Sequence, residues 1–174
     1  DLITEYPDDE VVDAAGCAVL PGFVNSHVHL YGTLAHGIVI EKPPTGFASF
    51  LDDYWWPQVE DRLDRQMISA ASAWVCAEML RSGTTTFFDI CEAPGALRGV
   101  LEAEAEQSRS TGIRGIFSFE ATERAGAKIA ELSLRENLDF IDQHQHDSMV
   151  SGAMSWHTVF TCSRSFIERA ATEA

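Results

Sequence analysis

Positive charge is scarce in this sequence of 174 residues. Twelve lysines and arginines stand against 27 aspartates and glutamates, so the formal net charge is −15, and Lys42 and Lys128 are the only lysines. A surface of this sign repels the phosphates of DNA and RNA. We therefore expect a protein with no nucleic-acid partner.

Long apolar runs are missing as well. No stretch reaches the roughly 20 residues that a membrane helix needs, and the first residues, DLITEYPDDE, lack the basic and apolar regions of a secretion signal. The four cysteines form no C-x-x-C pair, so neither a disulfide framework nor a thiolate zinc site is indicated. These absences predict a cytoplasmic protein with reduced thiols and no membrane partner.

What remains is the composition of a globular chain with a core, at 45% hydrophobic and 22% charged residues. Four apolar segments have the character of strands: FVNSHVHL, TTTFFDI, GIRGIFSFE and MVSGAMSWH. Helical segments follow them, with expected starts at Asp64, Pro94, Ser133 and Ser163. Strands that alternate with helices predict parallel βα units.

Two of these helices are predicted from short boundary signals. The pair Pro94-Gly95 is expected to open a helix that runs to about Gln107. Ser133 and Glu136 have the spacing of a capping box, which predicts a helix that begins there and continues through Ile141.

Two histidines, His27 and His29, end the first of these strands. Residues i and i+2 of a strand project from one face with Cα atoms about 7 Å apart, so two imidazoles can converge on one cation. Two structural histidines would have the same spacing, so the motif alone leaves both interpretations open. His144 and His146 have the same H-x-H spacing but follow an expected helix. Residues i and i+2 of a helix point in nearly opposite directions, so no metal role is expected for this pair.

The sequence around the first pair resembles a known enzyme family. VLPGFVNSHVHL resembles the first barrel strand of the amidohydrolase superfamily, and SGTTTFFDI resembles the second strand of its deaminase and chlorohydrolase branch. PQVEDRL, ENLDFI and HTVFTCS are similar to later landmarks of that branch. Phe119-Glu120 and the run after the histidines are most similar to aminohydrolases of the SsnA type, and the resemblance extends from about Asp9 to Ala174.

This resemblance implies an α/β fold, the N-terminal half of a TIM (β/α)8 barrel. Residues 22–174 would form its first four βα units, and residues 1–21 would form part of a small β-sandwich through a hairpin in EVVDAAGCAVL. A complete barrel takes about 250 residues, so a chain of this length would leave strand edges unpaired. Such edges favour association with another copy, and we expect a homo-oligomer.

The resemblance also implies roles for individual residues. His27 and His29 would hold one divalent metal ion, zinc or else iron, that activates water. Glu60 and His157 would contact a small-molecule substrate, and Asp89 would have a structural hydrogen-bonding role. The family's third metal histidine with its glutamate, its strand-six histidine and its strand-eight aspartate would follow the end of this chain. No catalytic residue is therefore expected within it, and the chain alone should be inactive.

The sequence departs from one group of the family. S-adenosylhomocysteine deaminases use arginines to hold a substrate carboxylate at positions that here are Phe119 and Ser133. Carboxylate recognition of that kind is not expected, although Arg114 and Arg124 lie nearby in the sequence and could substitute. Glu120 could instead accept hydrogen bonds from an amine or amidine.

The resulting hypothesis is a metal-dependent hydrolase of non-peptide carbon–nitrogen bonds, an aminohydrolase that deaminates a cyclic amidine or nucleobase-like ring. A chlorohydrolase or cyclic amidase on the same scaffold would carry the same strand-one motif. A catalytically inactive, truncated homologue that acts as a binding or assembly protein is the alternative from another class. The aromatic cluster Tyr54, Trp55 and Trp56 could line the pocket or pack as core.

Overall fold

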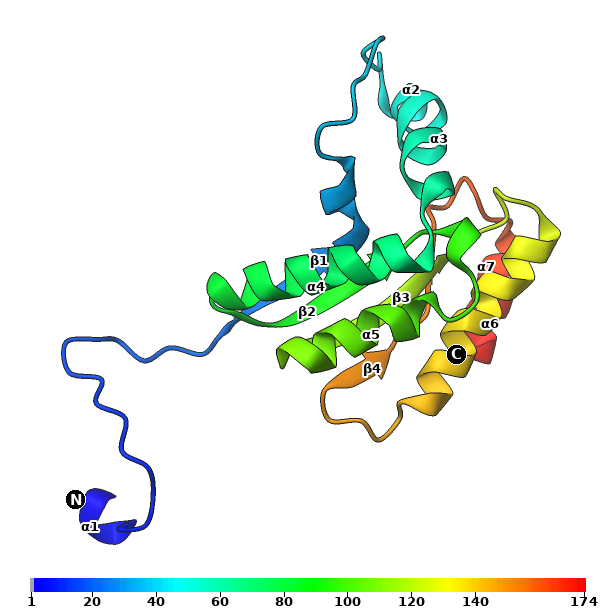
Figure 1. Ribbon diagram of the computed structural model, residues 1–174. Helices are drawn as coiled ribbons and strands as arrows, with labels where there is room; N and C mark the ends of the chain where they lie inside the picture. Colours follow the sequence, from blue (N-terminus) through cyan, green and yellow to red (C-terminus); the bar gives the residue numbers. More distant parts are fainter. Residues whose placement is uncertain (1) are drawn as a thin grey trace.

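A parallel sheet forms the centre of the computed structural model, which describes residues 2–174 (Figure 1). Its strands lie in the order β1 (Phe23–Val28), β2 (Thr84–Cys91), β3 (Arg114–Ala121) and β4 (Val150–Gly152), and β5 (Ser155–Trp156) pairs with the end of β3. Every strand pairing is parallel. The four strand segments expected from the sequence are confirmed, and so is their alternation with helices.

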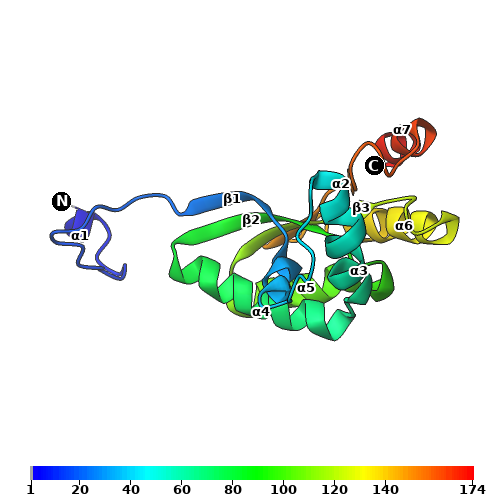
Figure 2. The ribbon, with the colours of Figure 1, turned by 90° about the horizontal axis from the view of Figure 1, so that it is seen from above.

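Helices pack on one face of this sheet. The longer ones are α4 (Arg65–Arg81), α5 (Val100–Thr111), α6 (Ala127–Gln143) and α7 (Arg164–Glu173). Figure 2 shows α4 and α5 on the same side of β1 and β2. Phe87 and Phe117 are fully buried and join residues of both helices in one core cluster. No helix among residues 2–174 has the length and apolar character needed to cross a bilayer.

Short helical turns connect β1 to α4 and stand over one end of the sheet (Figure 1). They are η1 (Leu30–Ala35), α2 (Phe47–Phe50), η2 (Leu51–Trp55), α3 (Trp56–Gln58) and η3 (Glu60–Arg62). The turn η4 (Pro94–Ala96) follows β2, and α1 (Leu2–Glu5) lies at the N-terminus. The connection between β1 and α4 therefore places the aromatic segment near the carboxyl ends of the strands.

The helix expected to open at Pro94-Gly95 begins later than predicted. Those residues form only the 3-10 turn η4, and α5 starts at Val100 and ends at Thr111 rather than at Gln107. Gly99 separates the two elements with a φ of 90°, a left-handed conformation that no α-helix contains. The prediction was wrong because proline signals a helix start without excluding a single turn.

The predicted capping box at Ser133 and Glu136 was also wrong. Both residues lie inside α6, which begins at Ala127. Residues three apart share a face of any helix, so the same spacing arises in a helix interior. The Glu136 carboxylate instead accepts hydrogen bonds from the backbone N–H of Gly99, at 2.8 and 2.9 Å, and of Leu101, at 3.1 Å. It therefore caps α5 from a neighbouring helix.

Replacing Glu136 by Ala should lower the free energy of unfolding by about 1–2 kcal/mol, because the first N–H groups of α5 lose their acceptor. Glu136→Gln keeps one side-chain oxygen and should lose less. Urea unfolding of the three proteins, followed by circular dichroism, measures both effects. Equal stability of the alanine variant and the unmodified chain would contradict this capping role.

The N-terminal segment differs from its prediction. Residues 6–22 contain no strand, and residues 3–24 are exposed apart from the half-buried Ala14. The segment extends away from the sheet in Figure 1. A hairpin with neither face packed on a core is at best marginally stable, which explains why the hairpin in EVVDAAGCAVL does not form. The assignment of residues 1–21 to a β-sandwich domain, and of residues 22–174 to a truncated barrel domain, stays a prediction.

Candidate active site

The two histidines of the first strand face the same side at the carboxyl end of β1. Their ring centroids lie 5.1 Å apart with the ring planes at 86°. His27 is exposed and His29 is half-buried. The two rings are near enough to contact one cation, as their spacing predicted.

His29 is oriented by the neighbouring strand. Its Nδ1 donates a hydrogen bond of 2.5 Å to the backbone carbonyl of Ile90. A carbonyl oxygen only accepts, so Nδ1 carries a proton, and in the neutral ring Nε2 then keeps its lone pair. A metal-binding imidazole needs this ring state, and carbonyl partners of this kind orient such ligands.

Asp89 of β2 holds the strand end beside this histidine. Its Oδ1 accepts a hydrogen bond of 2.7 Å from the backbone N–H of Leu30, and its Cα pairs in register with that of Val28. Burial raises the pKa of the Asp89 carboxyl to about 7. The structural hydrogen-bonding role expected for Asp89 is confirmed.

Glu60 lies buried under the aromatic segment, with 1% of its surface exposed. Its Oε1 accepts hydrogen bonds from the Tyr31 hydroxyl, at 2.9 Å, and from the Trp55 indole, at 2.6 Å. Its Oε2 accepts one from Arg124 at 3.1 Å. Burial raises the pKa of Glu60, and the hydrogen bond from Tyr31 and the positive charge of Arg124 oppose the rise. The carboxylate is thus oriented through both oxygens.

Arg124 is the cation that neutralises this region. Its guanidinium pairs with Glu60 at 3.1 Å, with Asp61 at 2.8 Å and with Glu92 at 2.8 Å, and it lies 5.0 Å from the ring centroid of Trp56. The side chain is only 10% exposed. The sequence analysis named Arg124 as a possible substitute for the arginines that bind a substrate carboxylate. In the structure its guanidinium is already paired with carboxylates of this chain. Arg114, the other candidate, donates to the backbone carbonyl of a surface loop.

His157 follows β5 and has both ring nitrogens paired. Nε2 accepts a hydrogen bond of 2.9 Å from the Trp56 indole, which can only donate. Nδ1 therefore carries the proton and donates to Glu120 Oε2 at 2.8 Å. His157 is 5% exposed. A substrate could reach Nε2 only by replacing the indole.

These side chains form one continuous cluster. The ring of His29 lies 5.5 Å from that of Tyr31, whose hydroxyl donates to Glu60. Arg124 pairs with Glu60 and lies against the ring of Trp56, whose indole donates to His157. The structure therefore brings the histidine pair, Glu60 and His157 together. The sequence analysis did not identify Tyr31 and Glu92 as site residues. The aromatic run at residues 54–56 did indicate the indole side chains that donate to Glu60 and His157. Trp55 and Trp56 serve as hydrogen-bond donors to the site.

The second histidine pair lies in a different environment. His144 ends α6 with 6% of its surface exposed, and its ring bonds to Glu102 at 2.8 Å and to Arg109 at 3.1 Å. His146 is exposed to solvent. These contacts tie α6 to α5 and account for His144 without a metal.

The fold makes this chain an α/β protein built from consecutive βα units. Its polar side chains gather at the carboxyl ends of the strands. Residues 18–174 match the family model described as "Amidohydrolase family". This chain belongs to the amidohydrolase family.

Two relatives place it near deaminases. The chain is 29% identical over 171 residues to 5-methylthioadenosine/S-adenosylhomocysteine deaminase of Thermodesulfovibrio yellowstonii, which covers 94% of this chain and 36% of the relative. It is also 29% identical over 177 residues to 5'-deoxyadenosine deaminase of Methanococcus maripaludis, covering 99% of this chain and 39% of the relative. The chain thus spans between a third and two fifths of the length of these relatives.

Solved structures share the fold. An adenosine deaminase of Xanthomonas campestris with bound zinc superposes with a TM-score of 0.71 at 23% identity, over 87% of this chain and 33% of that one. The atrazine chlorohydrolase TrzN of Arthrobacter aurescens, complexed with zinc, superposes with a TM-score of 0.64 at 21% identity, over 88% of this chain and 38% of that one. The expected parallel α/β fold of a TIM-barrel family is confirmed.

The residues of this chain fit part of a divalent metal site. Catalytic zinc sites use three protein ligands and one water. His27 and His29 offer two imidazoles on one side of β1, and the Ile90 carbonyl leaves Nε2 of His29 free to bind. A further ligand would have to come from outside these two residues.

Proposed function

We propose that this chain is the N-terminal part of a metal-dependent aminohydrolase that releases ammonia from a cyclic amidine such as an adenine-like ring. The observation that carries the proposal is the shared face of His27 and His29, with His29 oriented by the Ile90 carbonyl. The deaminase names of the two relatives support this reaction over the others on the same fold. Its homo-oligomeric state and cytoplasmic location stay predictions from the sequence.

His27 and His29 would hold one divalent ion. We propose zinc rather than iron because two solved neighbours of the same fold carry zinc. When bound, such an ion lowers the pKa of a water ligand to about 7 and supplies hydroxide at neutral pH.

Glu60 and His157 would bind the substrate. Glu60 Oε1 and His157 Nε2 are both acceptors, and each is paired with an indole N–H, from Trp55 and Trp56 respectively. An amidine or aminated ring presents N–H donors of the same kind, so it can take the place of the indoles without leaving an acceptor unpaired. Arg124 pairs with the second oxygen of Glu60, which orients the carboxylate and opposes the rise of its pKa.

Replacing His29 by Ala should lower the zinc content of the purified chain by the ion held at the histidine pair, because it removes one of the two imidazole ligands there. The measurement is zinc content after dialysis, by mass spectrometry of the metal. His146→Ala is the matched control, since it removes one histidine from the same H-x-H spacing at an exposed position. Equal losses of zinc in the two variants would refute the strand-one site.

The reaction itself requires the remaining barrel. A protein that joins residues 18–174 to the rest of the Thermodesulfovibrio relative should release ammonia from adenosine-type nucleosides, and His29→Ala should eliminate that release. Chloride release from a chlorotriazine without ammonia release from nucleosides would favour the chlorohydrolase alternative. A well-folded, zinc-loaded protein with neither activity would favour the non-catalytic alternative.

A further inference from the structure

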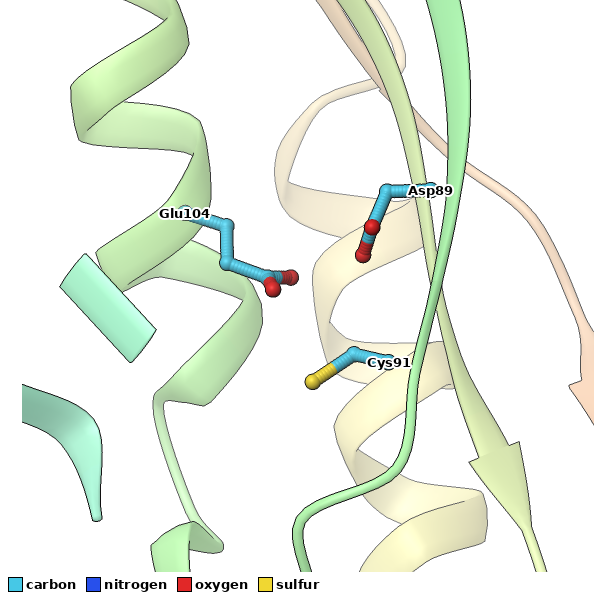
Figure 3. Close-up of side chains that lie close together, drawn as sticks. All are labelled: Asp89, Cys91 and Glu104. Carbon is cyan, nitrogen blue, oxygen red and sulfur yellow. The ribbon is translucent and has the colours of Figure 1, made fainter. Parts of the chain in front are cut away.

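Three buried side chains converge between the sheet and α5 (Figure 3). Asp89 and Cys91 project from β2, and Glu104 projects toward them from the helix. One ligand atom of each residue lies within 4.8 Å of the other two, and all three residues are 0% exposed. The cluster lies on the helix-facing side of β2, together with the buried core.

Most carboxylate oxygens of this cluster lack partners outside it. Asp89 Oδ2 and both carboxylate oxygens of Glu104 are buried and find no hydrogen-bond partner within residues 2–174 outside the cluster, where Glu104 lies against Asp89 and Cys91. Asp89 Oδ1 is occupied by the backbone N–H of Leu30. Two adjacent carboxylates in a dry interior repel each other and lose their hydration, so the pair needs either a shared proton or a bound cation. None of the arginines or lysines in the described chain pairs with these atoms.

We propose that Asp89, Cys91 and Glu104 bind a second divalent transition-metal ion, such as Zn²⁺, separate from the ion at the histidine pair. The Cys91 thiol releases its proton to solvent and binds as a thiolate, so the two carboxylates, the thiolate and the divalent ion together carry one net negative charge, less than the two carboxylates alone. Ligand bonds to zinc measure about 2.0–2.3 Å, so ligands on opposite sides of one ion lie about 4–4.6 Å apart. The three ligand atoms lie within 4.8 Å of one another, which is close to this range.

The mixed oxygen and sulfur ligands indicate which ions fit. Calcium and magnesium take six or more oxygen ligands, whereas thiolate and carboxylate together suit zinc and cobalt. The ion would join α5 to β2. Through the Asp89 bond to the N–H of Leu30, it would also steady the strand end that carries His29.

The test uses the chain with both His27 and His29 replaced by Ala, so that the proposed zinc site of the hydrolase cannot contribute. After loading with cobalt and gel filtration, this variant should retain one cobalt ion and show the near-ultraviolet charge-transfer band of a cobalt–thiolate bond. Cys91→Ser in this background should abolish the band. Cys162→Ser is the matched control, because Cys162 is a buried thiol in a separate core cluster, and it should leave the band intact.

Glu104→Gln provides a second variant that changes one atom and preserves the shape of the side chain. It should lose the bound cobalt while its circular dichroism stays that of the parent, so it decides the question even if Cys91→Ser fails to fold. Retention of no cobalt by the His27→Ala, His29→Ala variant would overturn the proposal and show that a shared proton compensates the two carboxyls. A thiolate band that survives Cys91→Ser would overturn it as well.

Discussion

Replacing Arg124 by Met is expected to lower the free energy of unfolding by about 3–5 kcal/mol at neutral pH. Its guanidinium pairs with Glu60 and Glu92, which are 1% and 0% exposed. Without it, two carboxylates stay in the interior with no arginine to compensate them, and Glu60 loses the contact that orients its Oε2. Urea unfolding at constant ionic strength measures the loss.

This loss should shrink as the pH falls. Burial raises the pKa of Glu92 well above its ordinary value, and the charge of Arg124 opposes that rise. In the variant the opposition is gone, so the folded-state pKa lies further above the unfolded-state value. Folded molecules then take up protons more readily than unfolded ones, and the variant recovers stability as the pH falls from neutral toward the unfolded-state pKa of the carboxyls. A deficit that stays constant over this range would contradict the explanation by buried charge.

Arg164→Met is the matched control for Arg124. Arg164 pairs with Glu168 at 2.7 Å on the surface of α7, where the two side chains are 91% and 61% exposed. Solvent screens such a pair, so its loss should cost less than about 1 kcal/mol. Comparable losses in both arginine variants would mean that the Glu60 and Glu92 carboxylates do not depend on Arg124.

The parts of the fold that the sequence predicted correctly are those with local causes. The Asp64 side chain accepts a hydrogen bond of 2.9 Å from the N–H of Met67, so the start of α4 was evident from its cap. Ser163 caps α7 in the same way. The start of α5 was wrong because its N–H groups bind Glu136, whose position depends on the packing of another helix. Local patterns cannot predict a cap supplied through tertiary structure.

In the candidate site, too, features with a local cause were predicted and long-range contacts were not. His27 and His29 were found because two residues of one strand share a face, and the structure places their rings together. The contact between Arg124 and Glu60 joins residues 64 positions apart, and that between Trp56 and His157 joins residues 101 positions apart. No spacing rule covers such distances. The family resemblance indicated the residues, whereas their hydrogen-bond partners required the fold.

Another long-range contact, made by the Asn137 side chain, replaces a missing strand pairing of the sheet next to the site. β4 pairs with β3 at residues 115–117 and β5 pairs with it at residues 120–121, so Phe119 lacks a strand neighbour on that side. Asn137 of α6 fills the gap, because its side chain donates to the Phe119 carbonyl and accepts from the Phe119 N–H, both at 2.7 Å. Phe119 directly precedes Glu120, the partner of His157.

Asn137→Leu should therefore lower the free energy of unfolding by about 2–4 kcal/mol, since it leaves the buried Phe119 N–H without an acceptor, while the carbonyl keeps the Ser155 hydroxyl. Hydrogen exchange at the Phe119 amide should accelerate relative to its neighbours in β3. Arg135→Ala, on the exposed side of the same helix, removes a surface ion pair worth about 0.5 kcal/mol or less and should leave that amide protected. If Asn137→Leu behaves like Arg135→Ala, the end of β3, and with it Glu120, is held by the strand pairings alone.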